Sequence, residues 1–407
     1  MLFRLLPLVV GAFAIGAETF MISGVLPVIS ADLQVSPAAA GSLVTIFALA
    51  YAVGSPLLAV ASAGVERKRL LLVAMGAFAL ANFLAALAPT FGWLAAARVL
   101  IALAAGAFTP AAIAFATTMH EPSRRGRAVA LIYAGMTLAT VIGVPAGAFV
   151  ASAASWRATF IGVGLLAGIA FAGVAFILPR LGGIEAIGLT ERLAVARRPA
   201  VLKALALTTL AVLGPFAANT YLGVLLESAL GVTGDGLAGL LMIFGLMGFA
   251  GSQFGGYGAD RWRREPFIAA ILIVLILSFA LLSIGPQWGG LPGGVAIILG
   301  ISFWGLFGWA FPVAQQARLV SLDPTLAPIT LSLNTSALYF GAAAGSALGG
   351  LAIREWSIDA VGWIAALSEA AALAYLVATD AKRLFARRTP TKAVCPSDGL
   401  PAEPDLA

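Results

Sequence analysis

Glu18 is an acidic residue within a long apolar run that covers residues 5–28. It lies about halfway along that run, and at such a depth in a bilayer an ionised carboxylate costs about 3 kcal/mol. A carboxyl group placed there can take up a proton because its neutral form avoids this cost. We therefore predict that Glu18 carries a proton. The alternative is a permanently protonated or hydrogen-bonded glutamate with a structural role.

Arg98 is the expected partner of Glu18. A guanidinium is effectively always charged, so inside an apolar run it needs an anion or carbonyl oxygens around it. The run that contains Arg98, residues 93–118, crosses in the opposite direction to residues 5–28, which brings the two side chains within reach. We predict an ion pair that opens when a proton or a substrate binds, which is a two-state element. The alternative is a structural tie between the two runs.

The composition requires a membrane environment for these runs. The chain has 407 residues, of which 61% are hydrophobic and 10% charged, whereas soluble domains average about 25% charged residues. Apolar runs of 20 or more residues indicate helices rather than the short alternating strands of a membrane barrel. The single histidine, His120, and the single cysteine, Cys395, exclude the usual metal, haem and disulfide frameworks, so no cofactor is expected.

Twelve such runs are each long enough to span a bilayer as a helix. They cover residues 5–28, 40–62, 70–88, 93–118, 128–151, 157–178, 203–226, 237–258, 266–284, 292–316, 327–351 and 357–379. The charged break at 180–202 predicts two six-helix bundles, residues 1–179 and 203–380, joined by a cytoplasmic linker. Residues 381–407 are basic and then Pro-rich, which favours a disordered cytoplasmic tail.

The positive charges orient the chain. Of its 24 Lys and Arg residues, 21 fall on the side that holds both termini and the linker. Loops rich in Lys and Arg face the cytoplasm. The sequence therefore predicts a multi-pass membrane protein with both ends in the cytoplasm. This asymmetry explains the net charge of +6 without a nucleic-acid partner; the lipid bilayer is the partner it implies.

The two halves of the chain carry a weak internal repeat. A shift of 197 residues aligns Gly54–Ser55 with Gly251–Ser252, and a shift of 202 aligns Gly143 with Gly345. Nearly constant offsets at equivalent places in two six-span halves indicate a duplicated bundle. Parallel repeats of this kind form a known transporter architecture with a substrate site near the midplane.

Four short motifs lie in the fourth span, in the fifth span, at the start of the sixth span and after the eighth span. They are Arg98-x7-Gly106, Gly143-x-Pro145-x-Gly147, Trp156-Arg157, and the loop Gly256-x-x-x-Asp260-Arg261-x-x-Arg264. On these motifs the chain resembles the major facilitator superfamily over about residues 5–380. Its first span, with Glu18-Thr19-Phe20, is most similar to the bacterial drug and sugar efflux branch that includes arabinose-efflux-permease-like proteins.

The resemblance implies an all-α integral membrane protein of two pseudo-symmetric six-helix bundles and no enzymatic activity. It implies a monomeric secondary transporter that works by rocker-switch alternating access. Export of a small organic molecule, such as a drug, sugar or related metabolite, would be driven by protons in antiport. Gating roles fall on Asp260, Arg261 and Arg264 in the loop, and on Gly143, Pro145 and Gly147 in the fifth span. In the first-half loop, Ala63 stands where the family has an aspartate.

Side chains on the spans expected to line the cavity are predicted to bind the substrate. They are Phe20, Phe47, Tyr51, Phe216, Asn219, Thr220, Tyr221, Gln315, Gln316, Asn334 and Tyr339. The amides can instead join helices, and the aromatic rings can be ordinary packing. The set favours a moderately lipophilic or neutral solute. Glu369 lies in a span that the family places at the periphery, and Glu227 is expected at the outer interface.

Other functions remain open. Uptake by symport or facilitated diffusion would use the same fold. A receptor or assembly protein that kept the fold would tolerate substitution of Glu18 and Arg98. An intramembrane enzyme is disfavoured because no nucleophile–base pair is evident.

Overall fold

The structure is a computed structural model that describes residues 2–62, 64–182, 188–323 and 326–385. Twelve spans of the described chain are long and apolar enough to cross a membrane, and none of its residues forms a strand. The prediction of an all-helical membrane protein with twelve spans is confirmed.

The first half contains six spans, preceded by the short helix η1 (Leu2–Leu5). In chain order its helices are α1 (Leu6–Asp32), α2 (Pro37–Ala61), α3 (Arg67–Ala86), α4 (Phe91–Thr118), α5 (Pro122–Leu138) continued by η2 (Ala139–Gly143) and α6 (Val144–Ala153), and α7 (Trp156–Ile177). The linker contributes α8 (Leu189–Ala196).

The second half repeats this order. Its helices are α9 (Pro199–Thr220) continued by α10 (Leu222–Leu230), α11 (Gly234–Arg261), α12 (Arg264–Trp288), α13 (Gly290–Leu322), α14 (Ala327–Glu355) and α15 (Ala360–Phe385). Each half packs in the same pattern: the third span contacts the fourth and sixth, the second contacts the fourth, and the first contacts the fifth and sixth.

Glycines at equivalent positions permit equivalent contacts in the two halves. A methyl group on Gly147 would lie 3.1 Å from Cβ of Met21, where α6 packs on α1. A methyl group on Gly349 would lie 3.0 Å from the carbonyl oxygen of Ala217, where α14 packs on α9. Small residues let membrane helices approach closely, so the repeat seen in the sequence corresponds to repeated helix packing.

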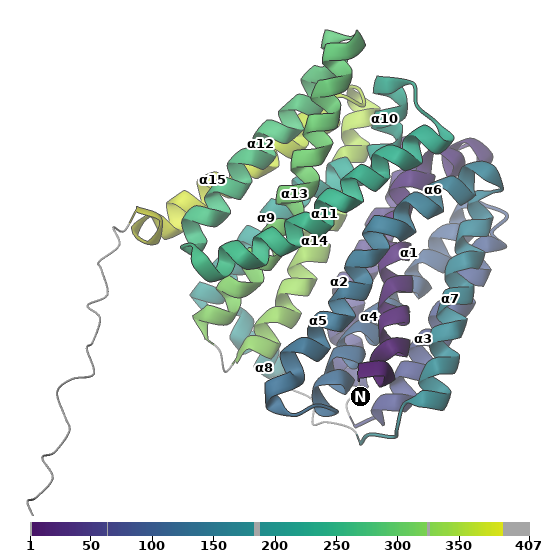
Figure 1. Ribbon diagram of the computed structural model, residues 1–407, viewed down its shortest axis with the longest axis vertical. Coiled ribbons are helices and arrows are strands. Elements are labelled where there is room, and N and C mark those ends of the chain that lie inside the picture. Colours follow the sequence, from purple (N-terminus) through teal and green to yellow (C-terminus); the bar gives the residue numbers. More distant parts are fainter. Residues whose placement is uncertain (1, 63, 183–187, 324–325, 386–407) are drawn as a thin grey trace, which may run out of the picture.

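The two halves meet at one side of the molecule. We call the side that holds Leu2 and α8 the linker side. The side that holds the turns 33–36, 154–155 and 356–359 is called the distal side. Figure 1 shows the helices of the two halves converging toward the distal side, near α6 and α10. There α2 packs against α14, and α11 packs against η2 and α6. The Ser346 hydroxyl donates a hydrogen bond of 3.0 Å to the Gly41 carbonyl across this seam.

Two spans that the hydropathy predicts as continuous helices are interrupted. The seventh span breaks at Tyr221, whose φ of −108° and ψ of 13° separate α9 from α10. The fifth span contains the π-helical turn η2, a feature that often marks functional sites. Hydropathy does not register either break, because the residues involved stay apolar while only the backbone hydrogen bonding changes.

Candidate functional site

Glu18 and Arg98 contact each other in the structure. Nη1 of Arg98 donates a hydrogen bond to Oε1 of Glu18, and both side chains are completely buried. The guanidinium carbon of Arg98 also lies 4.4 Å from the centre of the Phe47 ring, on α2. The pair therefore joins α1 to α4, and the ring joins both to α2.

The hydrogen-bonding capacity of this buried pair is only partly used. Within the described chain, Oε2 of Glu18 and both Nε and Nη2 of Arg98 have no hydrogen-bond partner. Buried polar groups in proteins are nearly always satisfied, so each exception calls for an explanation. A carboxylate with one free oxygen can accept a proton without first losing another contact.

Aromatic contacts connect the Glu18–Arg98 pair to the second half of the molecule. The rings of Tyr51 on α2 and Tyr339 on α14 stack with centres 3.9 Å apart and planes 23° apart. Phe47 also lies against Tyr339, with ring centres 6.3 Å apart. A change at Arg98 can therefore reach the interface between the halves through Phe47 and Tyr339.

A small cavity of about 100 Å³ lies beside this group, between Phe20 of α1 and the helices of the second half. Its walls are largely aromatic and apolar. They are Phe20, Ala211, Val212, Pro215, Phe216, Asn219, Phe244, Trp304, Gly308, Trp309, Phe311, Pro312, Leu338 and Tyr339. The Phe20 ring lies 5.3 Å from that of Trp309 and 6.2 Å from that of Phe216. Phe20 and Glu18 both lie on α1, so the same helix carries part of the cavity wall and one partner of the ion pair.

Of the residues predicted to bind substrate, the structure places Phe20, Phe216, Asn219 and Tyr339 in the cavity wall. Phe47 and Tyr51 lie next to the wall, in the contacts around Arg98 and Tyr339. These six residues come from four different spans, and only the packing of the two halves brings them together.

The other predicted residues lie away from this wall. The Tyr221 hydroxyl donates to the Ser346 carbonyl at the distal seam, and the buried Thr220 hydroxyl donates to the Phe216 carbonyl within its own helix. Half-buried Gln316 is also absent from the wall. These positions cannot be separated from wall positions by residue type alone.

Gln315 and Asn334 belong to a hydrogen-bond network inside the second half. Nε2 of Gln315 donates to the Ala204 carbonyl at 2.8 Å and approaches the Thr208 hydroxyl at 3.1 Å. That hydroxyl lies 2.7 Å from Oδ1 of Asn334. The network joins α13, α9 and α14, which is the helix-joining role that amides often have in membranes.

Three aromatic residues of the wall escaped the sequence analysis: Phe244, Trp304 and Trp309. They lie in apolar spans where aromatic rings are ordinary, so no local pattern marks them. Arg318 was also missed, since its position suggested a solvated loop. It is 4% exposed, and its Nη2 lies 2.6 Å from Oδ2 of Asp380 while its Nε lies 3.9 Å from Glu265.

The predicted gating loop lies on the linker side. Asp260, Arg261 and Arg264 are exposed there, and Nη1 of Arg261 donates to the Tyr257 hydroxyl at 3.0 Å. No ion pair joins Asp260 to another described residue. Ala63, the counterpart of Asp260, lies outside the described residues.

The glycine–proline motif of the fifth span packs on the first span at the ion pair. A methyl group on Gly143 would lie 2.9 Å from Cβ of Ala17, the residue before Glu18. Pro145 is the second residue of α6, which begins immediately after the π-helical turn. Movement of the fifth span would therefore displace the segment of α1 that carries Glu18.

The sequence model of the Major Facilitator Superfamily matches residues 8–323 of the chain. The chain belongs to the Major Facilitator Superfamily. The resemblance drawn from its motifs is confirmed, and the twelve spans make it a multi-pass membrane protein of this transporter family.

Relatives of this family member cover most of its length. It is 32% identical over 360 residues to the uncharacterized MFS-type transporter YbcL of Bacillus subtilis, which spans 88% of this chain and 91% of the relative. It is 31% identical over 351 residues to the inner membrane transport protein YdhP of Escherichia coli, with 86% and 89% covered. A crystal structure of a D-xylose–proton symporter shares its fold, with a TM-score of 0.73 at 15% identity over 91% of this chain and 96% of the symporter.

Proposed function

We propose that this protein is a proton-coupled antiporter that exports a small organic molecule from the cytoplasm of a bacterium. It works as a monomer in the inner membrane, with both termini and the linker in the cytoplasm. The single observation that carries the proposal is the buried Glu18–Arg98 ion pair, in contact through Phe47 with the interface between the halves. Family membership supplies the alternating-access framework.

Protonation of Glu18 is the coupling step. A proton that enters from the distal side adds to the carboxylate and removes its negative charge, so Arg98 loses its counter-ion. The guanidinium then has only the Phe47 ring and neutral groups near it, which weakens the contacts between α1, α4 and α2. One charge crossing 100 mV supplies about 2.3 kcal/mol, enough to drive roughly a fifty-fold gradient of a neutral solute.

The substrate binds in the cavity beside Phe20 and competes with the proton from there. Its walls are aromatic and apolar, with the Asn219 amide and the Tyr339 hydroxyl as polar groups. This chemistry suits a moderately lipophilic or neutral molecule with an aromatic or aliphatic body and few polar groups. A bound solute that displaces Phe20 would favour the deprotonated pair, which returns the proton to the cytoplasm.

The test is a proton-release assay in everted membrane vesicles energised to an acid interior and monitored with a pH-sensitive dye. A panel of drugs, sugars and nucleosides is added to vesicles containing wild type, Glu18→Gln or Glu369→Gln. Glu369 is a matched control, because it is a completely buried carboxylate on α15 that does not line the cavity.

We expect the solute to trigger proton release in wild type and in Glu369→Gln but not in Glu18→Gln. Coupled movement of solute and proton in the same direction would show uptake by symport instead. Undiminished release from Glu18→Gln would remove Glu18 from the coupling step. Equal amounts of folded protein in the vesicles, checked by size-exclusion chromatography, make the three variants comparable.

A further inference from the structure

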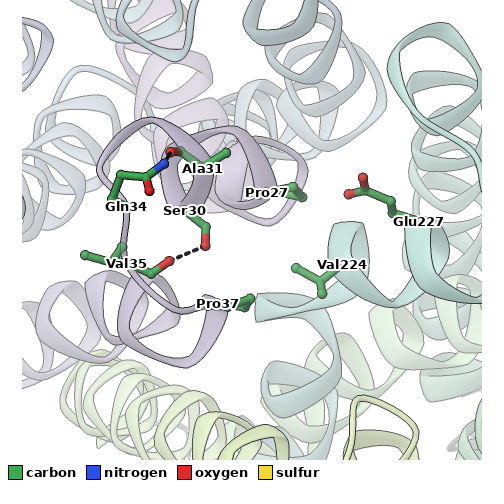
Figure 2. Close-up of a pocket in the computed structure, with 8 residues that line it drawn as sticks. All are labelled: Pro27, Ser30, Ala31, Gln34, Val35, Pro37, Val224 and Glu227. Carbon is green, nitrogen blue, oxygen red and sulfur yellow. Dashed lines mark hydrogen bonds between the residues drawn. The ribbon is translucent and has the colours of Figure 1, made fainter.

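A second pocket lies at the distal seam between the two halves of the molecule. It has a volume of about 370 Å³, within the range of about 300–1,000 Å³ that small-molecule sites occupy. The first half supplies the end of α1 and the turn to α2, and the second half supplies α10 (Figure 2). The lining residues are Pro27, Ser30, Ala31, Gln34, Val35, Pro37, Val224 and Glu227.

The polar groups of the first-half wall bond to that wall itself. The Ser30 hydroxyl donates to the Val35 carbonyl at 2.6 Å, and Nε2 of Gln34 donates to the Ala31 carbonyl at 2.7 Å. Gln34 is held at a positive φ of 52° in this turn, a conformation that costs energy in a residue with a side chain. The turn therefore forms one wall of the pocket, and these two side-chain donors are already used within the turn rather than available to a ligand.

Glu227 supplies the charge of this pocket. Figure 2 shows its carboxylate directed toward Pro27, across the pocket from Gln34. No described residue forms an ion pair with it. The remaining walls offer the apolar surfaces of Pro27, Pro37 and Val224. A negative group above an apolar floor is complementary to an amphipathic cation.

The charges of the distal side support the same conclusion. Its basic residues in the described chain are Arg157 and Arg354, and each is already engaged by a carboxylate. Arg157 lies 2.5 Å from Asp32, and Arg354 lies 2.8 Å from Glu355. Among the described residues, no cation therefore neutralises Glu227, and the local potential attracts positive ligands.

We propose that this pocket binds an amphipathic organic cation, an amine or quaternary ammonium with a small hydrophobic body. Because the walls belong to both halves, the pocket exists only while the distal seam is closed. A ligand that binds one state alone shifts the population toward that state. Occupancy would thus hold the transporter closed on the distal side. The pocket is separate from the cavity beside Phe20, and its existence does not depend on proton coupling.

The binding test uses the purified full-length protein in detergent micelles and benzyltrimethylammonium as the probe, titrated by saturation-transfer NMR. Glu227→Gln should weaken binding about five-fold, the effect of one partly exposed charge pair. Asp235→Asn is the matched control, since Asp235 is an exposed carboxylate of the distal side outside the pocket. Asp235→Asn and Phe20→Ala should bind the probe as wild type does.

Three results would overturn the site: no binding of the probe up to millimolar concentration, equal binding to Glu227→Gln, or loss of binding in Phe20→Ala alone. The last would place the cation in the central cavity.

State selection is tested with spin labels at Ala154→Cys and Ser357→Cys in a Cys395→Ser background. Both label positions are exposed on the distal side of different halves. The probe should enrich the short distances, and an unchanged or longer distribution would contradict a pocket that requires the closed seam.

Discussion

Replacing Glu18 with glutamine leaves the Arg98 guanidinium buried without a counter-charge. Both side chains are completely buried, and the Phe47 ring, whose centre lies 4.4 Å from the guanidinium carbon of Arg98, does not replace a full negative charge. Removing one partner of a buried ion pair costs about 3–5 kcal/mol. Because the glutamine oxygen can still accept a hydrogen bond from Nη1, we expect a loss near the lower limit, about 3 kcal/mol.

Removing both charges together should cost less than removing one. In Glu18→Gln/Arg98→Met the buried positive charge is gone, and the methionine side chain fills part of the same space. We therefore expect the double variant to recover at least about 2 kcal/mol relative to Glu18→Gln, because replacing a whole buried pair by apolar groups is often close to neutral. The two single variants are then strongly non-additive, as contacting residues are.

The assay is equilibrium unfolding of the purified protein in mixed micelles with increasing SDS, followed by circular dichroism. Asp32→Asn is the control, because the Asp32–Arg157 pair is 45% and 35% exposed and exposed pairs contribute at most about 1 kcal/mol. If Glu18→Gln unfolds at the same SDS fraction as wild type, Arg98 is stabilised by something other than Glu18. The coupling mechanism built on their pair would then be wrong.

Three further perturbations test other parts of the structure. Gly245→Val places a Cβ about 2.8 Å from Cα of Val141, so α11 must move away from η2. The spin-label distances on the distal side should then lengthen. An unchanged distance distribution would show that this contact does not hold the seam closed. Arg318→Met leaves Asp380 without its cation at 2.6 Å and should lower the free energy of unfolding by about 3 kcal/mol. A variant as stable as wild type in SDS would mean that water already solvates the carboxylate of Asp380. Phe20→Ala removes two ring contacts in the cavity and should weaken solute binding about ten-fold in a direct binding titration, whereas unaltered affinity would place the solute elsewhere.

The candidate site was predictable where it depends on charge in an apolar environment. Glu18 and Arg98 stand out from the sequence because a charge within a membrane span needs a partner, and the alternating direction of the spans brought them within reach. Phe20, Phe216, Asn219 and Tyr339 share the cavity wall, but the same reasoning also selected Gln315 and Asn334, which join helices. Asn219 and Asn334 are the same residue type in apolar spans, yet one lines the cavity and the other joins helices, and only the packing of the helices separates them.

The sequence by itself determined the twelve spans and the duplicated plan, because the bilayer imposes a length and an apolar character on every crossing segment. It also determined the family, through motifs that stay local to one span or loop. Only the tertiary structure decided that Arg98 contacts Phe47, that Tyr51 stacks on Tyr339, and that α1 and α10 enclose a pocket beneath Glu227. These contacts join residues far apart in the chain, and their geometry follows from how closely glycine-bearing helices can approach, which no hydropathy pattern encodes.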